Sequence, residues 1–124
     1  MLNLPASDRI YFCVLPIDMR RSFDSLAELA REQMGEEPMS GHLFLFRNKT
    51  EDCLKVLYWD RDGYAIWYKR LQKRKFSLPA IAGKSLEVDA TTFSMLLNGL
   101  DRKSLKRQKR YSMAKKESVA NLNV

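Results

Sequence analysis

The chain has 124 residues, of which 45% are hydrophobic and 30% charged, and its formal net charge is +7. This length allows one domain with a modest core and is too short for two ordinary domains. No apolar run approaches the roughly 20 residues of a membrane-spanning helix, and the N-terminus lacks the pattern of a secretory signal. We therefore expect a cytoplasmic protein with no membrane partner.

The positive charge is concentrated near the C-terminus. Residues 101–124 contain eight Lys/Arg and two acidic residues, a net charge of +6, which leaves only +1 for residues 1–100. We therefore expect a single α+β domain over residues 1–100 and a basic, flexible tail over residues 101–124. Such a tail commonly binds a polyanion, and nucleic acid is the leading candidate. The alternative is a solvated terminus that only aids solubility.

The N-terminal part of the domain predicts a strand followed by an amphipathic helix. Residues 9–15 form a strand candidate that Pro16 ends. Asp18 is positioned to cap a helix over residues 19–34, which Gly35 would stop. The apolar side of this helix would consist of Met19, Phe23, Leu26, Ala27, Ala30 and Met34.

The central part of the chain predicts a meander of strands. Residues 42–47, 53–59 and 64–70 are rich in aromatic and β-branched side chains. Polar turns over residues 48–52 and 60–63 separate them. Because these connections are short, we expect antiparallel hairpins.

Strand register determines which side chains share a face of this sheet. We expect Arg47 to pair with Cys53 and Trp59 with Tyr64. The first face would then be core, and it would carry Phe44, Phe46, Leu54, Val56, Tyr58 and Trp67. The second face would mix cations with aromatic rings, and it would carry Arg47, Lys55, Trp59, Tyr64, Tyr68 and Arg70. A shift of one residue in either hairpin would exchange partners between the faces.

The C-terminal part of the domain begins with a basic turn after the third meander strand. Residues 85–88 then predict a short edge strand, and Asp89 caps a helix over residues 90–98 that ends at Gly99. The expected fold is thus α+β: an antiparallel sheet meander with a helix packed on one face and a short C-terminal helix, both on the same side.

The expected nucleic-acid contacts combine the second sheet face, the basic turn and the tail. Cations would bind phosphate, and aromatic rings would stack on exposed bases. In the domain these residues are Arg47, Lys55, Trp59, Tyr64, Tyr68, Lys69, Arg70, Lys73, Arg74 and Lys75. In the tail they are Arg102, Lys103, Lys106, Arg107, Lys109 and Arg110.

No arrangement of a nucleophile and a base is evident, so we expect no enzymatic activity, no metal and no cofactor. Asp60 and Asp62 could share a divalent cation, as in metal-dependent nucleases, but Asp-Arg-Asp-Gly is also typical of a hairpin turn, which we favour. His42 is more consistent with a structural role. Cys13 and Cys53 are expected to be buried free thiols, since neither has a partner at zinc-ligand spacing.

Four ordered blocks of the chain resemble a known family. They are Pro16-x-Asp18-Met19-Arg20-x-Ser22-Phe23-Asp24-x-Leu26, Gly41-His42-Leu43-Phe44-Leu45-Phe46-Arg47-Asn48, Leu57-Tyr58-Trp59-Asp60-x-Asp62-Gly63 and Trp67-Tyr68-Lys69-Arg70-Leu71. These blocks are similar to the TnpB accessory proteins, the second open reading frame product of IS66-class insertion sequences. The resemblance covers about residues 9–101 and omits the tail. The chain departs from the family at Lys73-Arg74-Lys75, where a glycine is common.

The resemblance implies an accessory role in transposition, with the DNA ends of the element and a separate transposase as partners. It supplies no catalytic residues and no small-molecule substrate. Two other functions stay open from the residues themselves: a protein–protein adaptor that docks on the transposase, and, more remotely, a small metal-dependent nuclease that uses Asp60 and Asp62.

Overall fold

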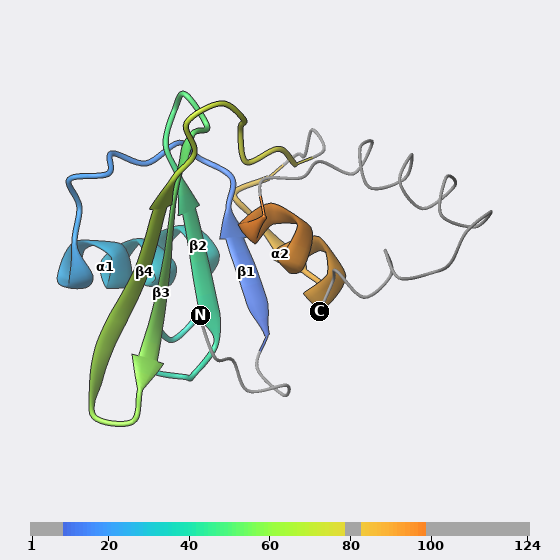
Figure 1. Cartoon of the computed structure of the whole chain (residues 1–124). Helices are drawn as coiled ribbons and strands as arrows, with labels where there is room; N and C mark the ends of the chain where they lie inside the picture. Colours follow the sequence, from blue (N-terminus) through green and yellow to red (C-terminus); the bar gives the residue numbers. More distant parts are fainter. Residues whose placement is uncertain (1–8, 79–82, 99–124) are drawn as a thin grey trace.

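The computed structural model describes residues 9–78 and 83–98, which form one sheet and two helices (Figure 1). In chain order the elements are β1 (Ile10–Cys13), α1 (Phe23–Met34), β2 (Leu43–Arg47), β3 (Cys53–Asp60), β4 (Gly63–Arg70), β5 (Ser85–Val88) and α2 (Ala90–Leu97). The α+β class is confirmed. The basic tail lies outside the described residues. Neither described helix is long and apolar enough to cross a bilayer.

The sheet has the strand order β4-β3-β2-β1-β5. The predicted meander is present, because β2 pairs antiparallel with β3 and β3 with β4. α1 connects β1 to β2, and these two strands are parallel, as expected for a helical crossover. The predicted edge strand β5 pairs antiparallel with β1.

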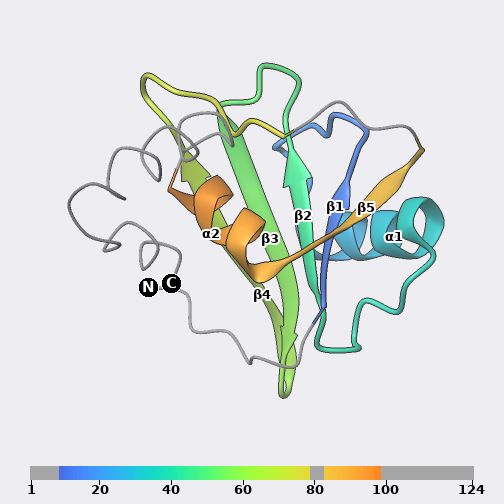
Figure 2. The ribbon, with the colours of Figure 1, turned by 90° about the vertical axis from the view of Figure 1, so that its right-hand side faces the viewer.

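The two helices cover opposite faces of the sheet (Figure 2). We call these the α1 face and the α2 face. α1 packs on one core cluster with Leu26 and Ala30, whereas α2 packs on a second cluster with Phe93 and Leu96. The expectation that both helices lie on one side is therefore wrong. The apolar run over residues 43–46 is the reason, because successive strand residues point to opposite faces and all of them are buried.

One hairpin has the predicted register and the other does not. Trp59 pairs with Tyr64, as expected, but Arg47 pairs with Leu54 rather than with Cys53. Asn48 extends the ladder, since its N–H donates to the carbonyl of Cys53 at 3.2 Å. The turn is therefore one residue shorter than residues 48–52.

This one-residue difference moves the whole of β2 relative to β3. Phe44 and Phe46 lie on the α1 face, in the same cluster as Leu57. Arg47 is directly opposite Leu54 and so joins the α2 face. The predicted assignment of side chains to the two faces is therefore wrong for β2. For β3 and β4 it is correct.

The helix ends agree with the sequence in three of four cases. Gly35 ends α1 with a left-handed backbone (φ 67°), and Asp89 caps α2 by accepting a hydrogen bond from the Thr92 N–H at 2.7 Å. α2 itself ends within a residue of the prediction. α1, however, begins at Phe23 rather than at Met19. Phe23, in the first turn of α1, is 44% exposed rather than buried with the apolar stripe.

Candidate nucleic-acid interface

Three segments that are distant in sequence meet at one end of the sheet, where β1, β2 and β4 end and β3 begins (Figure 1). We call residues 14–22, 47–52 and 70–78 the cationic end. The backbone N–H of Ile17 donates to the carbonyl of Arg47 at 2.9 Å and joins the first segment to the second. Leu71 and Phe76 donate to the carbonyls of Asp52 and Glu51 at 2.8 and 2.7 Å and join the third segment to the second.

The two ends of the sheet differ in charge. The cationic end contains eight Lys/Arg and three Asp/Glu, a net charge of +5. The opposite end, residues 35–42 and 60–63, contains one Arg and four Asp/Glu, a net charge of −3. We call it the acidic end. A phosphate backbone would therefore be attracted to one end and repelled from the other.

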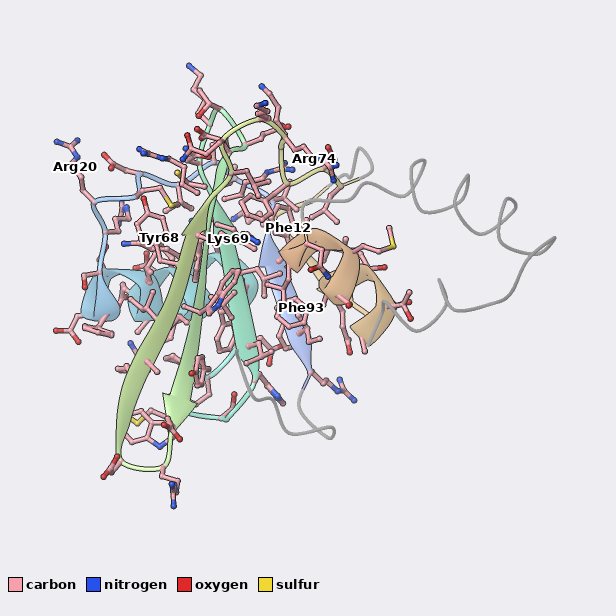
Figure 3. The ribbon with its side chains drawn as sticks, in the orientation of Figure 1. Phe12, Arg20, Tyr68, Lys69, Arg74 and Phe93 are labelled. Atoms are coloured by element: carbon pink, nitrogen blue, oxygen red, sulfur yellow. The ribbon has the colours of Figure 1, made fainter. Side chains whose placement is uncertain are left out.

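The exposed cations of the cationic end come from all three of its segments. They are Arg20, Arg21, Lys49, Arg70, Lys73, Arg74 and Lys75. Figure 3 shows Arg20 and Arg74 directed outward at this end of the sheet. The arrangement offers several phosphate contacts from rigidly connected loops, which is how proteins position themselves on a nucleic-acid backbone.

The basic stretch 72–75 is presented between two anchors. On one side, the Leu71 N–H continues the ladder onto β3. On the other side, the Phe76 ring is fully buried in the α2-face cluster. The intervening side chains at 72–75 are all exposed. None of residues 72–75 has a positive φ, so the turn does not require a glycine.

Lys55 has a structural position that the sequence did not indicate. It is 8% exposed, and its Nζ donates to the carbonyl oxygens of Met19 and Arg21 at 2.8 and 2.7 Å. The ammonium group also lies 4.9 Å from the centre of the Tyr68 ring. Lys55 therefore fixes the loop that carries the exposed Arg20 and is not itself available to a phosphate.

Arg47 also has intramolecular partners. Its guanidinium donates to the Phe76 carbonyl at 2.5 Å, lies 3.6 Å from the Glu51 carboxylate and stands 5.1 Å from the centre of the Phe12 ring. Burial lowers the pKa of Arg47, and Glu51 opposes that shift. Its function in the structure is to anchor the basic stretch to the end of β2.

Lys69 completes this set of anchored cations. Its Nζ donates to the carbonyl oxygen of Leu97, in the last turn of α2, at 3.1 Å. A cation at this position satisfies a carbonyl that the helix leaves free and complements the helix dipole. Figure 3 shows Lys69 directed from β4 toward the α2 side.

The aromatic residues predicted for base stacking share the α1 face, but Trp59 and Tyr64 lie apart from the basic stretch, and only Tyr68 is near it. Trp59 and Tyr64 form an edge-to-face pair with ring centroids 5.0 Å apart, next to the turn at the acidic end. Burial raises the pKa of Tyr64. Arg70 is six residues along β4 from Tyr64, or about 20 Å. Tyr68, at 52% exposure, is the most accessible of the three rings.

Asp18 and Arg20 interact closely within the first segment. The Arg20 Nη2 lies 2.7 Å from Asp18 Oδ2, and the Arg20 backbone N–H donates to Oδ1 at 2.8 Å. These hydrogen bonds lower the pKa of Asp18 to about 2. Asp18 therefore orders the loop before α1 rather than capping the helix. An open groove of about 450 Å³ separates this loop from the turn that carries Lys49.

The acids, the histidine and the cysteines that were considered for catalysis or metal binding lie in turns or in the core, or bond to the backbone. Asp60 and Asp62 flank a tight turn in which the Asp62 N–H donates to the Asp60 carbonyl, with Arg61 at φ 59°. His42 Nδ1 accepts a hydrogen bond from the Arg9 backbone at 3.3 Å. Both cysteines are buried and free, as predicted. Within residues 9–78 and 83–98, no three His, Cys, Asp or Glu residues are grouped as metal ligands would be.

Three exposed cations of this surface were not predicted from the sequence: Arg20, Arg21 and Lys49. The signal was the β-α-β order, because a helical crossover makes the flanking strands parallel and brings their carboxyl ends to one edge. Arg20 and Arg21 follow the end of β1, and Lys49 follows the end of β2. The predicted tail contacts, from Arg102 to Arg110, lie outside the described residues.

Comparison with known proteins gives a consistent set of relatives. A family described as "IS66 Orf2 like protein" matches residues 8–107. Uncharacterized protein y4jC of Sinorhizobium fredii (strain NBRC 101917 / NGR234) is 34% identical over 100 residues, which are 81% of this chain and 86% of that protein. Uncharacterized protein y4hO of the same strain is 33% identical over 101 residues, or 82% and 88% of the two chains. No solved structure matches.

Proposed function

Since the chain belongs to the IS66 Orf2-like family, which associates it with IS66 transposition, we propose that it is a non-catalytic accessory factor that binds DNA through its cationic end. In this proposal a separate transposase performs the strand chemistry. The chain would hold the DNA ends of the element by phosphate contacts.

The observation that supports the proposal is the separation of charge along the strands. Seven exposed Lys/Arg side chains occupy the cationic end, whereas acidic side chains dominate the acidic end. Arg47 and Lys55 donate to backbone carbonyls of two of these loops and hold them in place, and Lys69 holds the last turn of α2. The exposed cations are thus presented by a fixed scaffold, so little ordering entropy would be lost on binding.

The test is a salt titration of binding to duplex DNA from the element ends. Replacing Lys73, Arg74 and Lys75 together by Ala should weaken binding and lower the salt slope by roughly 2.7, because each phosphate contact contributes about 0.9. Arg61→Ala is the matched control, since it removes an exposed cation from the acidic end and should leave the slope unchanged. Equal slopes for all three proteins would contradict the proposal.

A second candidate is an adaptor that docks on the transposase. Leu15 and Phe23, at the two ends of the loop that carries Arg20, are 43% and 44% exposed. Aromatic and Arg side chains are enriched at protein interfaces. Phe23→Ala separates the two functions: the adaptor predicts lost transposase binding with unchanged DNA affinity, and the DNA-binding function predicts no change in either.

A further inference from the structure

The two edges of the sheet are unequal. β5 is a short edge strand of four residues and includes the exposed Glu87. β4, the opposite edge, has eight residues and contains no proline. Its central stretch, residues 64–68, carries no charge. Natural proteins protect edge strands by shortness, charge or proline, and the middle of β4 has none of these protections.

The hydrogen-bond pattern identifies which groups of β4 point to this open edge. Bonded pairs alternate along an antiparallel hairpin, and the Leu71 N–H donates to the Asp52 carbonyl. Odd-numbered residues of β4 therefore bond to β3, and the even-numbered residues direct their N–H and C=O groups outward. These are Tyr64, Ile66, Tyr68 and Arg70. No residue within the described ranges hydrogen bonds to their outward backbone groups.

We propose that β4 pairs antiparallel with β4 of a second copy of this chain, which would join two five-stranded sheets into one. A twofold axis at Trp67 gives the register in which every outward group of residues 64–70 finds a partner. Tyr64 then stands opposite Arg70 of the partner copy, and Ile66 opposite Tyr68. This inference does not depend on DNA binding.

The charges at the two ends of β4 favour pairing with a second copy of β4, and they favour the antiparallel orientation. β4 begins beside the acidic turn that contains Asp60 and Asp62, and it ends with Lys69 and Arg70. Antiparallel pairing brings the basic end of each strand to the acidic turn of the other. Parallel pairing would place the like charges side by side, which is destabilising.

The side chains facing each other in this register are compatible. Tyr64, Ile66, Tyr68 and Arg70 all lie on the α1 face. Arg70 would lie against Tyr64 of the partner copy, a cation–π geometry, with Asp62 diagonally beyond it. The two Trp67 side chains would meet across the axis on the α2 face, and aromatic cross-strand pairs stabilise sheets.

The test is sedimentation equilibrium of the full chain over a range of concentrations. The wild type should approach twice the monomer mass of 14.5 kDa. Tyr68→Pro removes an outward N–H and should raise the dimer Kd roughly 10- to 100-fold, since a bond is lost in each copy. The monomer should tolerate it, because this N–H faces away from β3. Tyr68→Ala is the matched control: it removes the same ring and keeps the N–H, so it should dimerise more tightly than Tyr68→Pro.

A charge exchange provides the second test. Arg70→Glu should weaken the dimer, because the new carboxylate would lie diagonally across from Asp62 of the partner copy, and adding Asp62→Lys should restore it. Hydrogen exchange of the Ile66 and Tyr68 amides should slow as protein concentration rises. A monomer at all concentrations would overturn the proposal, as would equal Kd values for Tyr68→Pro and Tyr68→Ala.

Discussion

Lys55 and Arg74 are both cations of the sheet region, yet the structure uses them in opposite ways. Lys55 is buried on the α1 face and holds two backbone carbonyls, whereas Arg74 is exposed in a loop at the cationic end. The same contrast separates Arg47 and Lys69, which contact carbonyls, from Lys73. The location of each cation determines its role. A cation on a covered strand must find acceptors inside the protein, because burying an unpaired charge is costly.

The strongest test of this contrast is Lys55→Met. The substitution leaves the carbonyls of Met19 and Arg21 without their donor, so we expect the free energy of unfolding to fall by about 2–4 kcal/mol. Urea unfolding measures this change. Lys73→Met is the control and should change stability by less than about 0.5 kcal/mol. Equal effects would show that Lys55 is not an anchor.

Lys69→Met should have a smaller effect, because it removes a single hydrogen bond to the Leu97 carbonyl from a half-buried side chain. We expect a loss of about 1 kcal/mol. Hydrogen exchange should be faster chiefly in α2, whose last turn Lys69 holds. Lys75→Met is the matched variant in the exposed stretch, and α2 exchange should be unchanged in it.

Removing exposed cations should weaken DNA binding and leave the stability of the fold nearly unchanged. The double variant Arg20→Ala with Arg21→Ala should alter unfolding by less than about 0.5 kcal/mol. It should lower the salt slope of duplex DNA binding by roughly 1.8, or 0.9 for each contact. Stability and binding are measured on the same preparation. A large loss of stability would place these side chains with the anchored cations.

The smallest expected effect concerns the pH dependence of Asp18. Its hydrogen bonds to Arg20 lower its pKa to about 2, below the ordinary value. A depressed pKa stabilises the folded state above the ordinary Asp pKa, and that contribution is lost as the pH falls through about 2. An NMR titration of the Asp18 carboxyl group should show this midpoint. In Arg20→Ala the pKa should return toward its usual range.

Much of the fold could be predicted from local patterns. The α+β class, the meander, the edge strand, Asp89 as a helix cap and Gly35 as a helix end all follow from propensity and turn chemistry. The candidate site was only partly predictable. The basic stretch 72–75 is exposed as expected, but the anchoring of Lys55 could not be read from its sequence neighbours.

Local sequence patterns are enough to identify the helices and strands of this protein, its family and the register of the β3–β4 hairpin. The register of this hairpin follows from its turn alone, because Asp60-Arg61-Asp62-Gly63 is typical of a single tight turn between the two strands. The face that each side chain of β2 occupies depends instead on how β2 pairs with β3 in the folded protein. A turn shorter by one residue after Asn48 exchanges every side chain of β2 between the faces, since strand residues alternate with a period of two. With both faces covered by helices, apolar character could not reveal that exchange, and the position of Arg47 depended on it.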